Sequence, residues 1–108
     1  ADGKANGTRM CLENIGRFFD IQIEKIKEVA PPAPSDPVIE LSQFTKNRIE
    51  GAILQSFNPL IIDKRLRDTP EHFEWFRAHY DHPREFAAYQ IKDATAEETG
   101  SLKKLGFR

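Results

Sequence analysis

The 108-residue sequence contains a single cysteine, a single methionine and a single tryptophan, and it has no long apolar run. Because Cys11 has no second cysteine to pair with, it cannot form an intramolecular disulfide. This favours a reducing compartment, either the cytoplasm or an organelle matrix. No apolar stretch approaches the roughly 20 residues that a spanning helix requires, so we expect no membrane span. The length predicts one domain at most.

The sequence also lacks the short motifs that identify common catalytic, phosphate-binding and metal-binding sites. It has no glycine-rich phosphate loop, no nucleophile motif and no paired-cysteine or His-Glu-x-x-His metal motif. His72 and His79 lie seven residues apart, about 10 Å along a helix, which is too far to bind one ion. We therefore predict no enzymatic activity, no catalytic residue, no metal, no cofactor and no small-molecule substrate, although a bound metal would reopen the enzyme class.

Proline, by contrast, is concentrated in one place. Four of the seven prolines lie between residues 31 and 37. Such a run favours polyproline II and excludes helix, so it predicts a semi-rigid spacer about 20–25 Å long. We therefore divide the chain into an N-terminal helical arm (1–30), a proline-rich spacer (31–37) and a compact helical body (38–108).

Apolar residues recur at helical spacing through the arm, after a first segment, residues 1–7, that we expect to be frayed. The stripe continues to about Ala30 and predicts one long helix, although residues 19–23 also alternate as a strand would. A lone helix on a stiff spacer cannot bury such a stripe by itself. We predict that the stripe binds a partner through Ile15, Phe19, Ile23 and Ile26.

The body is predicted to contain three to four short helices, which makes the fold class all-α. A helix is expected from Ser42 to Phe57, with Gly51 inside it to admit another helix closely, and Asn58-Pro59 should end it. Residues 63–68 are interpreted as a polar connection. Thr95 and Glu98 match a capping box for a last helix, which Gly100 should limit.

The stretch from Thr69 to Ile91 holds the tryptophan, both tyrosines and all three histidines. Thr69 and Pro70 predict a helix start, and a second helix should begin near Pro83. Aromatic residues at helical spacing favour a core. The body nevertheless carries nine aromatic rings, which is more than one small core holds, so Trp75 and Tyr80 are predicted to anchor a partner.

These patterns favour a non-catalytic accessory or structural subunit that binds other protein subunits of a larger assembly. The alternative is a nucleic-acid-binding module, because residues 41–67 carry five basic and only two acidic side chains. An acidic segment follows directly, with eight acidic and three basic side chains in residues 68–100, which weighs against that alternative. The basic residues of this alternative site are Lys46, Arg48, Lys64, Arg65 and Arg67.

Overall fold

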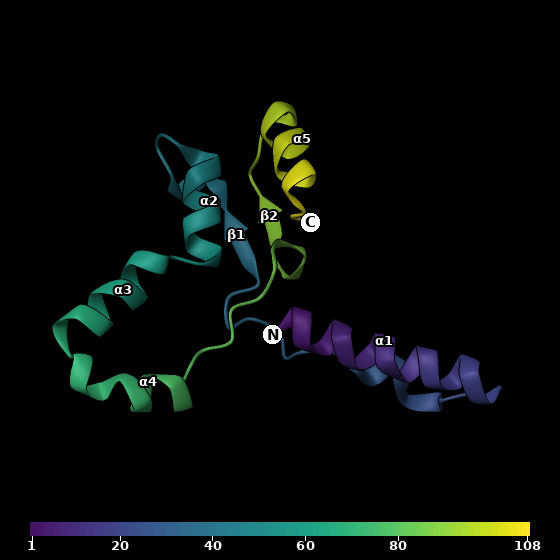
Figure 1. The fold of residues 1–108 in the computed structure, drawn as a ribbon. Helices are drawn as coiled ribbons and strands as arrows, with labels where there is room; N and C mark the ends of the chain where they lie inside the picture. The colour runs from purple at the N-terminus through teal and green to yellow at the C-terminus, as the bar shows by residue number, and fades with distance from the viewer. The chain divides into compact units, whose positions relative to one another are not determined.

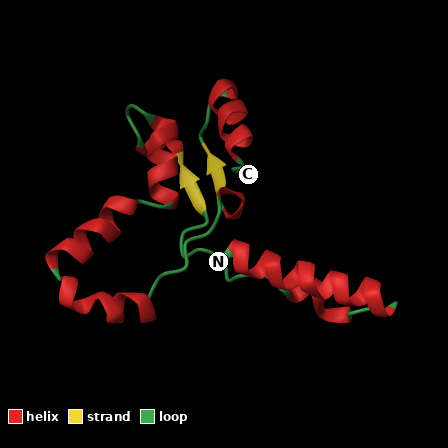
Figure 2. Ribbon diagram, in the orientation of Figure 1, coloured by secondary structure: helices red, strands yellow, loops and turns green.

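The computed structural model describes all 108 residues and divides them into two compact units, Ala1–Ala33 and Pro34–Arg108. Helix accounts for 62% of the residues and strand for 6%, distributed over five α-helices and two short strands (Figures 1 and 2). The predicted mostly helical fold with a long N-terminal helix is confirmed. None of the helices is both long enough and apolar enough to cross a membrane.

The first unit is built on α1 (Asp2–Phe19), which includes the residues that we expected to be frayed. Asp2 lies in the first turn, where a carboxylate stabilises the helix dipole. The helix ends at Asp20, whose φ of 52° is left-handed, and the Ile21 N–H then donates to the Gly16 carbonyl at 3.0 Å. The prediction of one helix continuing to Ala30 is therefore wrong beyond Phe19.

After this turn the chain folds back along α1 and forms the 3-10 helix η1 (Glu24–Glu28). Gly16 permits the return, because a Cβ at this position would lie 3.0 Å from the Ile21 carbonyl oxygen and 3.8 Å from the Ile23 side chain. The returning chain thus approaches α1 more closely than a side chain at position 16 would tolerate, which explains the glycine inside the helix.

The second unit contains a parallel strand pair, β1 (Val38–Glu40) and β2 (Gln90–Lys92), with Ile39 opposite Ile91. The pairing extends to the last residue, since the Ile91 N–H donates to the Arg108 carbonyl at 2.8 Å and the Arg108 N–H donates to the Tyr89 carbonyl at 3.0 Å. Neither strand was predicted from the sequence, because three residues are too few to show alternation.

The core of this unit lies around the strand pair, which α2 (Arg48–Ser56) and α5 (Ala96–Leu105) flank in Figure 2. The Phe86 and Phe107 rings stack with centroids 4.4 Å apart. The buried Tyr89 hydroxyl donates to the Ser56 carbonyl at 3.1 Å and so links the end of α2 to β2. The buried apolar residues are Ile39, Leu41, Ala52, Tyr89, Leu102 and Phe107.

The segment before α2 differs from the predicted helix starting at Ser42. Leu41–Gln43 form a 3-10 turn, η2, that buries Leu41, and α2 starts only after Asn47, which has a left-handed φ of 50°. Gly51 does permit a close approach, but of a ring rather than a helix. A Cβ on Gly51 would lie 2.7 Å from Cδ1 of Phe44.

Two further helices, α3 (Pro59–Asp68) and α4 (Phe73–Ala78), follow α2, joined by the 3-10 turn η3 (Pro70–His72). Asn58 caps α3 by accepting a hydrogen bond from the Leu60 N–H at 3.0 Å. Residues 63–68 are therefore helical and not a polar connection. Neither helix contributes a residue to the core, and Figure 1 shows them as an excursion between α2 and β2.

Two other boundaries differ from the expected ones, and one agrees. The helix predicted from Pro83 is a single 3-10 turn, η4 (Phe86–Ala88). The capping box is confirmed, because the Thr95 side chain accepts from the Glu98 N–H and the Glu98 side chain accepts from the Thr95 N–H. Gly100 does not limit α5, which continues to Leu105.

Candidate functional site

A largely apolar hollow of the second unit lies between α3 and α4. Its volume is about 350 Å³, within the range of small-molecule pockets. We call it the α3–α4 hollow. It is lined by Ile62, Arg65 and Leu66 of α3, Phe73, Trp75, Phe76 and Arg77 of α4, and His79, Tyr80 and Asp81 beyond α4.

Aromatic rings form one wall of the hollow, and their positions follow from helical spacing. Trp75 and His79 are one turn apart, and their rings stack with centroids 4.1 Å apart at 13°. His79 Nδ1 also lies 2.8 Å from the Trp75 carbonyl oxygen, which fixes the imidazole against the indole. Phe76 meets Trp75 edge to face at 5.8 Å.

These rings are largely solvent-exposed, contrary to the expectation that the aromatic stripe forms a core. Trp75 is 58% exposed and Tyr80 43% exposed. Phe73 is also exposed, and only Phe76 is half-buried. The structure therefore brings the predicted anchors Trp75 and Tyr80 together on the wall of one hollow.

The charged side chains of the hollow differ in their partners. Arg77 lies 3.5 Å from Glu74 and places its guanidinium 5.9 Å from the Phe73 ring centre. Arg65 has no ion-pair partner. The hollow can thus hold an apolar or planar group that carries one acidic substituent.

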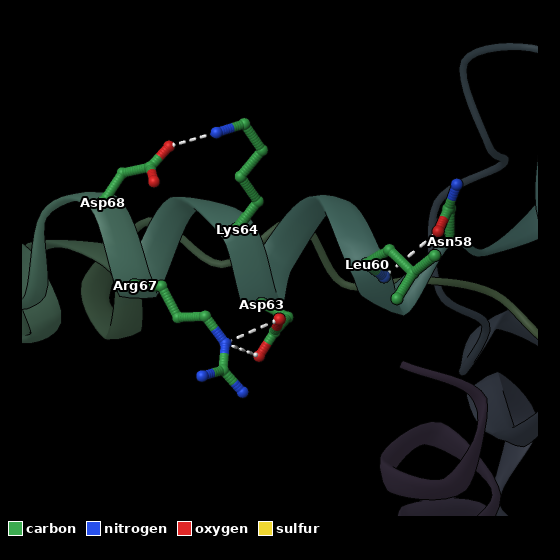
Figure 3. Close-up of polar contacts among 6 residues, drawn as sticks. All are labelled: Asn58, Leu60, Asp63, Lys64, Arg67 and Asp68. Atoms are coloured by element: carbon green, nitrogen blue, oxygen red, sulfur yellow. Dashed lines mark hydrogen bonds and ion pairs between the residues drawn. The ribbon is translucent and has the colours of Figure 1, made fainter.

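The basic residues proposed for nucleic acid are mostly engaged within the chain. On α3, Lys64 pairs with Asp68 at 2.6 Å and Arg67 with Asp63 at 2.9 Å, as Figure 3 shows. The hydrogen bond to Asp63 and its negative charge raise the pKa of the Arg67 guanidinium above its ordinary value.

The other three basic residues do not restore a cationic face. Arg48 lies 3.3 Å from Glu98 and donates to the Asp93 carbonyl at 2.5 Å, so it ties α2 to the start of α5. Lys46 and Arg65 remain without an ion pair. Neutralised charges of this kind attract phosphate weakly.

The three histidines lie close in sequence but do not converge. His72 contacts Phe76, His79 stacks on Trp75, and His82 meets Tyr80 edge to face at 5.9 Å. No three side chains of histidine, cysteine, aspartate or glutamate are grouped as a metal ion would require.

The four partner-binding residues predicted in the arm do not share a face. Ile15 and Phe19 project from one side of α1 and are 45% and 64% exposed. Ile23 and Ile26 are half-buried after the turn, and they line a depression together with Gly16. At about 100° per residue, Gly16 lies about 100° around the helix from Ile15 and about 160° from Phe18.

Two functional features escaped the sequence analysis. The α3 wall of the hollow, Ile62 and Leu66, has helical spacing and could have been recognised from the Asn58-Pro59 start. Phe18, at 83% exposure, is the most exposed large apolar residue of the chain. The single stripe we assumed passes through Phe19 and left Phe18 out.

Comparison with curated proteins identifies a class, the dehydrogenases, among the relatives. Over 107 residues, 99% of this chain, the sequence is 47% identical to an erythronate-4-phosphate dehydrogenase of Porphyromonas gingivalis, and over 91 residues it is 47% identical to one of Bacteroides thetaiotaomicron. A third, from Pseudoalteromonas atlantica, is 25% identical over 111 residues. No protein-family model and no solved structure matches.

The chain spans only part of these relatives. The matched segment covers 29%, 24% and 30% of the Porphyromonas, Bacteroides and Pseudoalteromonas proteins, respectively. Each of them is therefore more than three times as long as the segment that it shares with this chain.

These relatives correct the functional predictions. The non-catalytic structural subunit, its nucleic-acid-binding alternative and the absence of enzymatic activity are wrong, because relatives 47% identical over most of the chain are named as an enzyme. The prediction of protein subunits as partners without a small-molecule substrate is wrong for the same reason. The absence of catalytic motifs from these 108 residues does not exclude an enzyme, because the relatives are more than three times as long as the matched segment.

Proposed function

We propose that this chain is a segment of a dehydrogenase that oxidises erythronate 4-phosphate. One observation carries the proposal, namely 47% identity over 99% of the chain to a protein with that name. The match extends over 107 residues and therefore over both units of the chain.

The chemistry of that substrate favours a place for it outside the α3–α4 hollow. Erythronate 4-phosphate carries a carboxylate, a phosphate and two hydroxyl groups, so it needs several charged and hydrogen-bonding partners. The hollow offers mainly ring faces, the unpaired Arg65 guanidinium and the Arg77 guanidinium, which is paired with Glu74. It also contains the Asp81 carboxylate, which would repel an acid. We therefore infer that the hollow does not hold the phosphorylated acid.

The proposal is tested with the full-length polypeptide that contains these 108 residues. Oxidation of a hydroxyl group removes two electrons, so the assay supplies the protein with a panel of hydride acceptors and with erythronate 4-phosphate. We expect reduction of an acceptor that depends on the substrate and on the protein. Erythronate without the phosphate serves as the matched control and should react at least 100-fold less efficiently.

Two results would overturn the proposal. One is the absence of acceptor reduction with erythronate 4-phosphate across the whole panel. The other is equal efficiency with the unphosphorylated acid, which would indicate an enzyme that does not recognise the phosphate.

We further infer a reducing compartment for this enzyme. Cys11 lies on the surface of α1 and forms no disulfide. An exposed thiol of this kind is compatible with a thiol-reducing environment and vulnerable in an oxidising one.

A further inference from the structure

We propose that the α1 face formed by Ile15, Phe18 and Phe19 packs into an apolar groove on the part of the polypeptide outside these 108 residues. The proposal rests on the proposed function, because that function makes the chain a segment of a longer enzyme. We call these three residues the α1 apolar face.

The three side chains lie together and are exposed. At about 100° per residue they span one 100° sector of the helix, with Ile15 between the two phenylalanines. Their exposed fractions are 45%, 83% and 64% for Ile15, Phe18 and Phe19. The two rings meet edge to face with centroids 5.0 Å apart, so they already form an ordered aromatic pair.

The first unit contains nothing that covers this face. No residue of α1 is buried, and η1 packs on the side of the helix where Gly16 lies. The helix also carries three glycines, Gly3, Gly7 and Gly16, each of which disfavours helix relative to alanine. A helix with this composition relies on packing against other parts of a protein.

The length of the relatives identifies the occupant. The 47% identity extends over 99% of this chain and therefore over α1, while less than a third of the relative is matched. A tethered surface within the same polypeptide meets α1 at a high effective concentration, which favours it over a separate molecule.

The charges around α1 argue against a lipid surface. Helices that lie on membranes present a basic polar face opposite the apolar one. Here the charges have both signs, with Asp2 and Glu13 among Lys4, Arg9 and Arg17, and Arg9 lies 4.0 Å from Glu13. A mixed polar face of this kind fits the surface of a folded protein.

The test measures backbone hydrogen exchange of α1 in the full-length polypeptide. We expect the amides of residues 12–19 to be protected, and the double substitution Ile15→Ala with Phe19→Ala to accelerate their exchange at least tenfold. Met10→Ala is the matched control, because Met10 is 59% exposed and lies about 180° around the helix from Phe19. It should change the exchange less than twofold.

If the double variant does not fold, the conservative variant Phe19→Leu is measured instead. It should accelerate the exchange of the α1 amides less than Phe19→Ala does. Equal exchange in the unaltered protein and the double variant would overturn the proposal. Protection that disappears on 100-fold dilution would also overturn it, since a second copy would then cover the face. The same preparation is assayed with erythronate 4-phosphate, so a failure of the proposed function appears as missing turnover with α1 protection intact.

Discussion

Gly51 shows how one residue is subject to two opposing effects. In the middle of α2 an alanine would favour helix by about 0.5–1 kcal/mol. Its Cβ would, however, lie 2.7 Å from Cδ1 and 2.9 Å from Cγ of Phe44, a half-buried ring packed against the core. Because Cγ is the root of the ring, the whole side chain would have to move.

We predict that Gly51→Ala lowers the free energy of unfolding by about 1–2 kcal/mol, since overpacking typically costs more than the propensity gains. Urea denaturation followed by circular dichroism measures the change. Gly100→Ala is the control, because a Cβ at Gly100 meets no atom within 4 Å, and it should stabilise the chain by about 0.5–1 kcal/mol. An unchanged or increased stability of Gly51→Ala would contradict the clash.

Single residues also explain why two helix boundaries differ from the predicted ones. Asp20 and Asn47 adopt left-handed backbone conformations, and these end α1 and delay α2. Aspartate and asparagine visit this region more readily than most residues do, but they are equally common elsewhere. The residue type therefore permits such a turn without predicting it.

At the scale of elements, α5 is the helix whose beginning is fixed most locally. Thr95 and Glu98 satisfy each other's backbone N–H groups at 3.2 Å and 3.1 Å. The whole signal lies within four consecutive residues, which is why the sequence alone predicted this start correctly.

We predict that Thr95→Ala destabilises the chain by about 1 kcal/mol, because it leaves the Glu98 N–H in the first turn without its side-chain acceptor. Thermal or urea unfolding measures the effect. Thr99→Ala is the matched control, inside the same helix and outside the capping box, and should change stability by less than about 0.5 kcal/mol. Equal effects of the two substitutions would show that the capping box contributes nothing.

Other elements were less predictable because their causes are not local. The strands β1 and β2 are three residues each and form through pairing of residues 52 positions apart in sequence. Residues 63–68 seemed a polar connection because of their charges, but Asp63 with Arg67 and Lys64 with Asp68 are pairs that stabilise an exposed helix.

Across the whole second unit, stability should be uneven. Every buried apolar residue lies in η2, β1, α2, α5 or the segments flanking β2 and α5. The excursion α3–α4 contributes none of them, and its charged pairs are exposed. Regions with few buried contacts open at a lower free energy than the core does.

We predict that brief trypsin treatment of the 108-residue chain cuts the second unit first at Lys64, Arg65, Arg67 or Arg77. Arg48, which is tied to Glu98 and Asp93, should be cut at least tenfold more slowly. Mass spectrometry of the fragments gives the order of cleavage. The control is the same digestion in denaturing urea, in which no site should be preferred. Early cleavage at Arg48 would show that the excursion is as stable as the core.

How far structure and function could be predicted from the sequence also depends on the whole molecule. The helical content, the capping box and the exposed Trp75 and Tyr80 could be predicted from composition and spacing. The α3–α4 hollow could not, because it depends on how two helices meet. The enzyme class could not either, because the matched segment is less than a third of each dehydrogenase compared.

The hydrogen bonds between β2 and Arg108 have a consequence for synthesis on the ribosome. Ile39 and Leu41 are translated before their core partners Leu102 and Phe107, which come more than sixty residues later. At about 5–20 residues per second the nascent chain carries those apolar side chains for several seconds before the core can close. Folding of this unit can therefore be completed only after Phe107 and Arg108 have emerged from the ribosome, and until then a chaperone has time to bind.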